Sequence, residues 1–388
     1  MSPRIEVATV VTRMIAGAGG VALRGARALD PARYHVTFVT GEAGPLAEQA
    51  TDAGMDVLIA PSLVAPLSPR HDLVALGRLT ELFRAHPFDV VHTHSAKAGA
   101  VGRLAAHRCG VPVIAHSYHG FPFHEFQSPL RRQAYVAVER RLARLTDVVL
   151  CIGTGVATEA LRRGLADGTR LRTIAPVVEA RIVPATPASR QSARQALGLP
   201  AHAVVVGTVG RLDYQKAPEH FVAAIADLRR TRPDAHGVWI GSGPMLEEVR
   251  RLVRDLGLED HVLLAGERRD VADLLPAFDA FAMSSRYEGL PCAVVEAMRC
   301  GIPVVVTAVN SVPDLVVPGE TGVLVPPGRP HDLASALTRV LDEPGWAAGM
   351  VARGRERAAD AFDEQRLGTT LDEEYTRALR ASLTAMAG

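Results

Sequence analysis

The stretch AFAMSSRYEGLPCAVVEAMRCGIPVVV, residues 280–306, decides the fold of the second half of the chain. It opens with an apolar run of strand length, turns at Gly289 and Pro291, continues with a helical pattern and ends in a second apolar run. Two buried strands joined by one helix are the unit from which parallel sheets are built. We therefore predict parallel strands over Ala280–Met283 and Val304–Thr307, with a helix between them.

The same alternation of strand-length apolar runs and amphipathic stretches extends over the whole chain, which predicts an α/β fold with parallel sheets. Four prolines and several small residues interrupt it between Pro176 and Pro200, so we place a domain junction there. We predict two doubly wound, Rossmann-like domains. Their bounds are 1–180 for an N-terminal domain, 181–202 for a linker, 203–355 for a C-terminal domain, and 356–388 for C-terminal helices that pack back towards the N-terminal domain.

The predicted strands divide into two sets of six. Those of the first domain are Ile5–Val11, His35–Val39, Met55–Ile59, Asp89–His92, Pro112–Ala115 and Asp147–Cys151. Those of the second are Ala203–Val209, Gly237–Ile240, Val262–Leu264, Ala280–Met283, Val304–Thr307 and Val323–Val325.

Length and composition are typical of a globular two-domain protein, with 388 residues, 48% hydrophobic and 22% charged. The net charge of +1 gives no reason to expect nucleic acid as a partner. Four cysteines without a CxxC pair indicate reduced, packed thiols. No secretion signal opens the chain, and no apolar run approaches the roughly 18 residues of a spanning helix. We expect a cytoplasmic protein, with peripheral contact at the inner membrane face left open.

Ligands of an open parallel sheet bind beyond the carboxyl ends of its strands, so residues that follow the strands are candidates for the site. Arg211 and Lys216 follow one strand, five residues apart, a spacing that can bring two cations onto one diphosphate. Of the 43 basic residues 41 are arginines, and Lys216 is one of only two lysines. Glu288 and Glu296 flank a predicted helix start, whose amides over residues 290–294 can cradle an anion. A glutamate there can also merely stabilise the helix dipole.

The N-terminal half carries weaker signals at its strand ends. Three glycines after the first strand either let amides approach a phosphate or allow tight packing, and their spacing is not GxGxxG; they are Gly17, Gly19 and Gly20. Five histidines within 33 residues suggest either a zinc site or hydrogen bonds to substrate and backbone, and we favour the second and predict no metal; they are His92, His94, His116, His119 and His124. Lys97 opens a helix, where it meets either an anionic group or solvent.

Residues 128–147, SPLRRQAYVAVERRLARLTD, predict a basic amphipathic helix with Ser128 as N-cap and Pro129 at the first helical position. Its predicted apolar face is Leu130, Ala134, Ala137, Val138, Leu142 and Leu145. Its arginines include Arg131, Arg132, Arg140, Arg141 and Arg144. Such a helix lies either on an anionic membrane surface or on the solvated outside of its domain.

The run from Ser284 to Pro327, with Glu288 and Glu296 as its E-x7-E element, resembles the retaining glycosyltransferases of GT-B fold in the large family 4. GRLDYQK at residues 210–216 and LAGERRDV at residues 264–271 match two further family segments, and the resemblance covers nearly the whole chain. The first half is similar to members that build bacterial polysaccharides and lipid-linked glycans. The resemblance implies two Rossmann-like domains facing a cleft, with an acceptor-binding N-terminal domain over 1–180 and a nucleotide-sugar-binding C-terminal domain over 203–355. It also implies metal-independent transfer of a sugar with retention.

The resemblance also assigns roles. It implies that Arg211 and Lys216 neutralise the donor diphosphate, that Glu296 holds the ribose and that Glu288 contacts the transferred sugar. The remaining donor contacts that it implies are the amides after Gly289, at Leu290, Arg268 near the nucleobase, the loop with Gly17, Gly19 and Gly20 over the diphosphate, and His119 at the sugar. We therefore predict His119, Glu288, Arg211 and Lys216 as the catalytic set, and His94, Lys97 and His124 as acceptor contacts.

The predicted co-substrate is a UDP-linked N-acetylhexosamine or hexose, with no further cofactor. The predicted acceptor is a hydroxyl of a lipid-linked glycan or of a small natural-product aglycone or aminocyclitol. Two segments depart from the family pattern: residues 310–314 replace Gly-Gly-x-x-Glu, and residues 175–179 replace Asn-Gly-Ile/Val-Asp. A non-hydrolysing nucleotide-sugar epimerase and a non-catalytic two-lobed sugar-binding protein are the alternatives. E-x7-E and GRL-x4-K favour transfer over the first, and the missing leader argues against the second.

Overall fold

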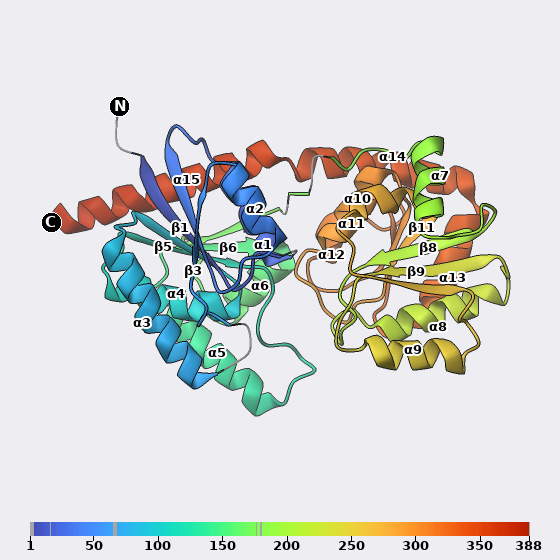
Figure 1. The fold of residues 1–388 in the computed structure, drawn as a ribbon, viewed down its shortest axis with the longest axis horizontal. Coiled ribbons are helices and arrows are strands. Elements are labelled where there is room, and N and C mark those ends of the chain that lie inside the picture. The colour runs from blue at the N-terminus through green and yellow to red at the C-terminus, as the bar shows by residue number, and fades with distance from the viewer. Residues whose placement is uncertain (1–3, 16, 65–67, 176, 179–180, 388) are drawn as a thin grey trace. The chain divides into compact units, whose positions relative to one another are not determined.

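The computed structural model describes residues 4–15, 17–64, 68–175, 177–178 and 181–387. The chain forms two compact units, each with its own parallel sheet (Figure 1). The N-terminal unit combines Met1–Val177 with Asp363–Gly388, and the C-terminal unit is Val178–Phe362. The predicted pair of doubly wound α/β domains is thereby confirmed.

The N-terminal sheet has seven strands in the order β3-β2-β1-β4-β5-β6-β7. Their bounds are β1 Ile5–Val11, β2 Tyr34–Thr40, β3 Asp56–Ile59, β4 Val90–His94, β5 Val113–Tyr118, β6 Val148–Ile152 and β7 Leu171–Ile174. All neighbouring strands pair in parallel. The order reverses between β1 and β4, which makes their carboxyl ends a topological switch point.

Helices cover both faces of this sheet. The helices of the unit are α1 Ala18–Arg27, α2 Pro45–Asp52, α3 Pro69–Ala85, α4 Ala96–Arg108, α5 Pro129–Ala143, α6 Thr154–Arg162 and α15 Glu364–Ala387. Val7 and Val11 of β1 pack with α1, α2 and α15, whereas Ala8 and Val10 pack with α3 and α4. Since successive strand residues point to opposite faces, each face receives its own apolar layer, as a doubly wound sheet requires.

The final helix, α15, packs closely on α1 within the N-terminal unit. A Cβ at Gly368 would lie 2.1 Å from the carbonyl oxygen of Ala28, so only glycine permits this approach. The α15 side chains Leu367, Leu371 and Tyr375 enter the same apolar cluster as β1. The end of the chain therefore completes the N-terminal core.

The C-terminal sheet has six parallel strands in the order β10-β9-β8-β11-β12-β13. They are β8 Val204–Val209, β9 Ala235–Ile240, β10 Val262–Gly266, β11 Ala280–Met283, β12 Val304–Thr307 and β13 Val323–Val325. The helices are α7 Pro187–Ala196, α8 Pro218–Arg229, α9 Leu246–Asp255, α10 Val271–Leu274, η1 Leu275–Ala277 (a 3-10 turn), α11 Cys292–Cys300, α12 Val312–Leu315, α13 Pro330–Asp342 and α14 Pro344–Ala361. Here the order reverses between β8 and β11.

Two boundary predictions were wrong. The expected linker over residues 181–202 contains α7, because Thr186 and Ser189 form a capping box that starts a helix at Pro187. Arg194 on α7 donates to Asp279 at 2.7 Å, so the helix is fixed to the C-terminal unit. The expected block 356–388 divides between the units after Phe362, since α14 belongs to the C-terminal unit and α15 to the other.

The predicted apolar face of α5 was wrong at most positions, although Leu142 is buried as predicted. Leu130 and Val138 lie on the exposed side, and the buried side carries Val136, Glu139 and Leu142. Glu139 faces inward because fully buried Arg103 on α4 donates to its carboxylate at 2.7 Å. Ser128 occupies the N-cap position of α5, but its side chain forms no cap hydrogen bond.

Candidate active site

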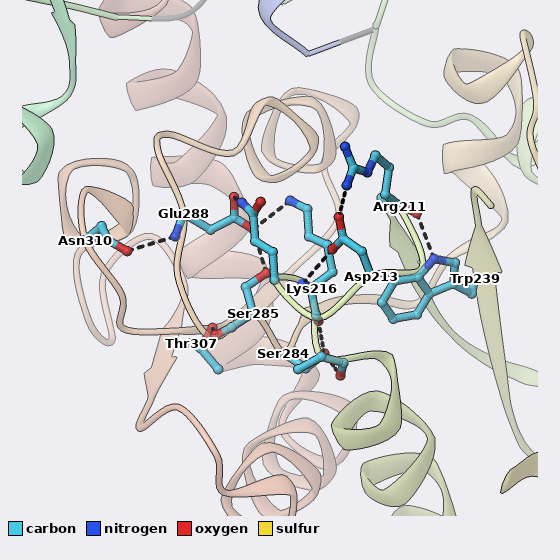
Figure 2. Close-up of polar contacts among 12 residues, drawn as sticks. Arg211, Asp213, Lys216, Trp239, Ser284, Ser285, Glu288, Thr307 and Asn310 are labelled. Atoms are coloured by element: carbon cyan, nitrogen blue, oxygen red, sulfur yellow. Dashed lines mark hydrogen bonds and ion pairs between the residues drawn. The ribbon is translucent and has the colours of Figure 1, made fainter. Parts of the chain in front are cut away.

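The loops after β8 and β11 meet at the switch point of the C-terminal sheet, where four hydrogen bonds hold Glu288 (Figure 2). Its Oε1 accepts from the ammonium of Lys216 at 2.6 Å and from the hydroxyl of Ser285 at 2.6 Å. Its Oε2 accepts from Nε2 of Gln215 at 3.2 Å, and its backbone N–H donates to Oδ1 of Asn310 at 2.8 Å. Partners from three loops thus fix Glu288, whose side chain is only 5% exposed.

Arg211 lies on the same loop as Lys216, but it is 67% exposed and pairs with Asp213. Oδ1 of Asp213 also accepts the backbone N–H of Lys216 at 3.1 Å, so one carboxylate links both predicted phosphate ligands. The indole of Trp239 donates to the carbonyl of Gly210 at 2.8 Å and anchors the start of the loop. The loop therefore presents two cations from a braced backbone, one exposed and one partly buried.

Two hydroxyl groups join these loops by donating hydrogen bonds to backbone carbonyls. Ser284 donates to the carbonyls of Lys216 and Ala217 at 3.0 and 2.9 Å, and Thr307 donates to the carbonyl of Ser285 at 2.8 Å. Four residues of this site were not predicted from the sequence: Ser284, Ser285, Gln215 and Asn310. The paired serines directly after β11 and the departure from the family pattern at residue 310 were the available signals.

The other residues of this unit that were predicted to contact the sugar donor lie at two places. Gly289 and Leu290 are buried directly before α11, and Glu296 is half-buried on that helix. Pro291 at the N-cap provides no side-chain acceptor, so the first-turn amides lack a side-chain cap. Arg268 follows β10, and β9 lies between β10 and β8 in the sheet. Its guanidinium donates two hydrogen bonds to the carboxylate of Asp270, at 2.8 and 2.5 Å.

The N-terminal glycines surround the start of α1, after the carboxyl end of β1. Gly17 is the N-cap residue with φ of 81°, a left-handed conformation that favours glycine. A Cβ at Gly19 would lie 2.8 Å from the carbonyl oxygen of Arg13, so close packing accounts for that glycine. Gly20 is buried in the first turn.

Four of the five histidines gather at the ends of β4 and β5. His94 Nδ1 lies 2.9 Å from His119 Nε2, the rings of His92 and His94 are 4.1 Å apart, and His116 Nδ1 lies 2.8 Å from the hydroxyl of Thr93. Burial lowers the pKa of His92 to about 3 and that of His119 to about 4, and it lowers the pKa values of His94 and His116 well below the usual range. The four rings are therefore neutral at pH 7 and act as hydrogen-bonding groups.

The predicted acceptor residues are dispersed. His94 belongs to the histidine cluster, whereas Lys97 forms an ion pair with Asp72 of α3 and is only 8% exposed. His124 lies beyond β5, in the loop with Phe126, and its backbone N–H donates to Gln127 at 3.3 Å. In the described part of the chain, no three metal-ligating side chains come together to hold an ion.

Among the helices of the described residues, none combines the length and apolar character needed to cross a bilayer.

Comparison with known proteins agrees with this architecture. Residues 16–177 match the family described as the glycosyl transferase 4-like domain, and residues 189–357 match the glycosyl transferases group 1. The chain is 32% identical over 313 residues to a D-inositol 3-phosphate glycosyltransferase of Saccharomonospora viridis, which covers 76% of this chain and 71% of that protein. The chain belongs to this family of glycosyltransferases.

Two further similarities extend over most of the chain. A UDP-Gal:alpha-D-GlcNAc-diphosphoundecaprenol alpha-1,3-galactosyltransferase of Escherichia coli is 28% identical over 344 residues, which are 88% of this chain and 89% of that enzyme. The crystal structure of Anabaena HepE in complex with UDP and glucose has a TM-score of 0.84 at 22% identity, covering 96% of this chain and 100% of that one. The fold is thus that of the GT-B glycosyltransferases, and the protein is a glycosyltransferase.

Proposed function

We propose that the protein transfers a hexose or N-acetylhexosamine from a UDP-sugar to a hydroxyl acceptor with retention of configuration, as a member of family 4. The observation that carries this proposal is the fixed carboxylate of Glu288, held by Lys216 and Ser285 at the switch point of the C-terminal sheet. The names of the Escherichia coli relative and of the HepE complex support UDP as the nucleotide.

The chemistry assigned to this unit is stabilisation of a leaving diphosphate. Breaking the bond between sugar and phosphate places negative charge on the phosphate oxygens, and preorganised cations and amides stabilise that charge. Lys216 can donate its two other N–H groups to phosphate while it keeps Glu288, and the exposed guanidinium of Arg211 adds a second cation. The N-terminus of α11, which has no side-chain cap, supplies further positive potential, so this mechanism assigns no role to a metal.

Sugar and ribose recognition is assigned to carboxylates. Glu288 is a largely buried carboxylate with fixed oxygens, which suits the hydroxyl groups of the transferred sugar. Glu296 on α11 is assigned to the ribose, and Arg268 to the nucleobase. In the N-terminal unit, the Gly17–Gly20 loop is assigned to the diphosphate and the neutral imidazole of His119 to the sugar.

The acceptor that we propose is a lipid-linked glycan, reached from the cytoplasmic face of the membrane. Exposed Phe126, Leu130 and Val138 on and before α5 lie among arginines of the same helix, which suits an anionic bilayer surface. The name of the Escherichia coli relative includes a diphosphoundecaprenol acceptor, which supports this choice. A small cyclitol or aglycone is the second candidate, which the name of the Saccharomonospora viridis relative favours.

The experiment that tests the proposal incubates the protein with radiolabelled UDP-glucose, UDP-galactose and UDP-N-acetylglucosamine, with and without polyprenyl-diphosphate-linked N-acetylglucosamine as the acceptor. We expect slow hydrolysis of one donor alone and faster transfer with the acceptor, with the α-linkage of the donor kept in the product. No turnover of any of the three donors would contradict the assignment of UDP, and a β-linked product would contradict retention.

A further inference from the structure

Tyr375 joins the C-terminal helix α15 to the histidines at the end of β4. The side chain is fully buried, and its hydroxyl lies 2.6 Å from Nδ1 of His92. The two rings meet edge to face with their centroids 5.8 Å apart. Burial raises the pKa of Tyr375 above its ordinary value, so its hydroxyl is protonated at neutral pH. A residue from the end of the chain thus contacts the strand that carries the cluster.

Both nitrogens of His92 are engaged. Nε2 lies 2.8 Å from the hydroxyl of Ser117 on β5, while Nδ1 meets Tyr375. A neutral imidazole has one donor and one acceptor nitrogen, and each hydroxyl partner can fill the complementary role. The ring cannot turn without breaking two buried hydrogen bonds, so Tyr375 and Ser117 fix its orientation.

The fixed ring of His92 supports His94, and His94 supports His119. The centroids of His92 and His94 are 4.1 Å apart, and His94 stacks on His119 at 5.2 Å with an angle of 23° between the rings. The His94–His119 hydrogen bond of 2.9 Å fixes which nitrogen of His119 remains for other partners. That nitrogen, Nδ1, is buried and has no hydrogen-bond partner among the residues that the structure describes.

A buried polar atom without a partner is costly, and a ligand hydroxyl would satisfy it. Tyr375, His92, His94 and His119 therefore form a row of side chains in contact. It runs from Tyr375, which cannot reach the substrate, to Nδ1 of His119, which is suited to bind it. We propose that Tyr375 is a positioning residue that orients His119 for the donor sugar through His92 and His94. This inference rests on the proposed contact between His119 and the sugar.

Helix α15 has other anchors, which allow the hydroxyl of Tyr375 to be removed without losing the helix. Tyr34 donates to Asp372 at 2.6 Å, and Arg172 pairs with Glu374 at 2.9 Å. The row also borders a cavity of about 20 Å³ that Tyr375 helps to line, so deleting the whole ring would open a larger void. Tyr375→Phe keeps the ring and is the appropriate variant.

The matched control is Tyr34→Phe. It also removes a tyrosine hydroxyl bound to α15, in this case a partly buried one, and its ring lies 6.1 Å from that of Tyr375. Among the described residues, the hydroxyl partners of His92 are Tyr375 and Ser117, not Tyr34. Both variants therefore test loss of one hydrogen bond at the same helix. Only one of them removes a member of the row.

We expect Tyr375→Phe to lower kcat/KM for hydrolysis of the UDP-sugar. The expected decrease is about three- to tenfold, which corresponds to the loss of one oriented hydrogen bond. Binding of UDP alone, which has no sugar, stays unchanged. Tyr34→Phe changes neither quantity. Equal losses in the two variants, or a loss of UDP affinity in Tyr375→Phe, would overturn the inference, since either result indicates a general structural effect.

His119→Ala separates this inference from the function on which it rests. If His119→Ala leaves turnover of the UDP-sugar unchanged, the proposed sugar contact fails. If it lowers turnover, the double variant decides: we expect Tyr375→Phe to have no further effect in the His119→Ala background. Additive losses would overturn the positioning role while leaving the sugar contact intact.

A readout without substrate complements the kinetics. The imidazole ¹⁵N resonances of His119 report its tautomer and hydrogen bonding, and we expect Tyr375→Phe to shift them and Tyr34→Phe to leave them in place. Unchanged His119 resonances in Tyr375→Phe would overturn the inference whether or not a donor has been identified.

Discussion

Lys216 donates a hydrogen bond from its ammonium to Oε1 of Glu288 across 2.6 Å and so joins the loop after β8 to the loop after β11. The two side chains are 20% and 5% exposed. The pair fixes both a cation and an acceptor at the switch point, where ligands of open parallel sheets bind. Loss of either partner leaves a charged group in a largely desolvated site.

Lys216→Ala lowers kcat of donor hydrolysis by at least about tenfold, because a cation that stabilises the leaving diphosphate is removed. The measurement is steady-state kinetics with the UDP-sugar, alongside circular dichroism to verify the fold. Arg232→Ala is the control, since it breaks an ion pair with Asp342 elsewhere in the same unit. Kinetics like those of the wild type in Lys216→Ala would defeat the assignment.

Glu296→Gln removes a charge from α11 with little change of shape. We expect it to weaken binding of both UDP and the UDP-sugar by about tenfold, since a carboxylate makes stronger hydrogen bonds to hydroxyls than an amide. Isothermal titration with UDP and with uracil measures this, and uracil binding should stay constant because it lacks the ribose. Glu247→Gln, at an exposed ion pair on α9, serves as control. An equal weakening of uracil binding would instead indicate a distorted unit.

Asn310 has φ of 44°, and its side chain accepts the backbone N–H of Glu288. Asn310→Ala and Asn310→Gly both lose this acceptor, so both should lower kcat/KM through a less fixed Glu288. Alanine is strained in the left-handed region, so the alanine variant should be less stable than the glycine variant by about 1 kcal/mol. Urea denaturation compares the two. Equal stabilities would contradict the strain, and unchanged kinetics would contradict the positioning of Glu288.

The free energy of unfolding of the N-terminal unit should decrease as the pH is lowered. An unfolded histidine titrates near 6.5, whereas burial lowers the pKa of His92 to about 3, so the unfolded chain binds more protons between these pH values. The contribution of neutral His92 is therefore fully present above pH 6.5 and is lost as pH falls, by about 1.4 kcal/mol per pH unit. Calorimetry in buffers of different ionisation enthalpy at pH 5 should show net proton uptake on unfolding. The control is His331→Gln, which changes a side chain that is 80% exposed and should leave the proton uptake unchanged. If the wild-type protein showed no proton uptake, His92 would not be buried in its neutral form.

The exposed face of α5 predicts binding to anionic vesicles. Phosphatidylglycerol-containing vesicles should float the protein at low salt and release it at high salt, because screening weakens the arginine contacts. Leu130→Gln should reduce flotation, whereas Leu383→Gln, an exposed leucine on another helix, should not. Retention in the pellet fraction at all salt concentrations would favour a small soluble acceptor.

The strands and the nucleotide-side motifs were predictable because their signals are local. Apolar runs fixed β11, β12 and β13 to the residue, and strand-end position assigned Lys216 and Glu288 to one edge. Strand β7 was missed because it is a short edge strand with Arg172 at its second position, without a continuous apolar run. Asn310 was missed as a partner of Glu288 because the two residues are 22 positions apart and meet only through the sheet.

The errors on helices have a common cause in tertiary contacts. Hydrophobic spacing placed Leu130 and Val138 inside, but the Arg103–Glu139 pair turned α5 the other way. The proline-rich texture around residue 187 suggested a linker, but Thr186 and Ser189 cap a helix there. In both cases a few polar contacts determined a local structure that apolar periodicity did not predict.

The packing of α15 against α1 has a consequence for biosynthesis. The C-terminal unit is one continuous segment, residues 178–362, and can finish folding when that segment has left the ribosome. The N-terminal unit is made first but lacks the Leu367, Leu371 and Tyr375 layer of its core until the last helix emerges. Its apolar face over α1 therefore stays open throughout synthesis of the second unit, and His92 gains its tyrosine partner only after α15 has been made.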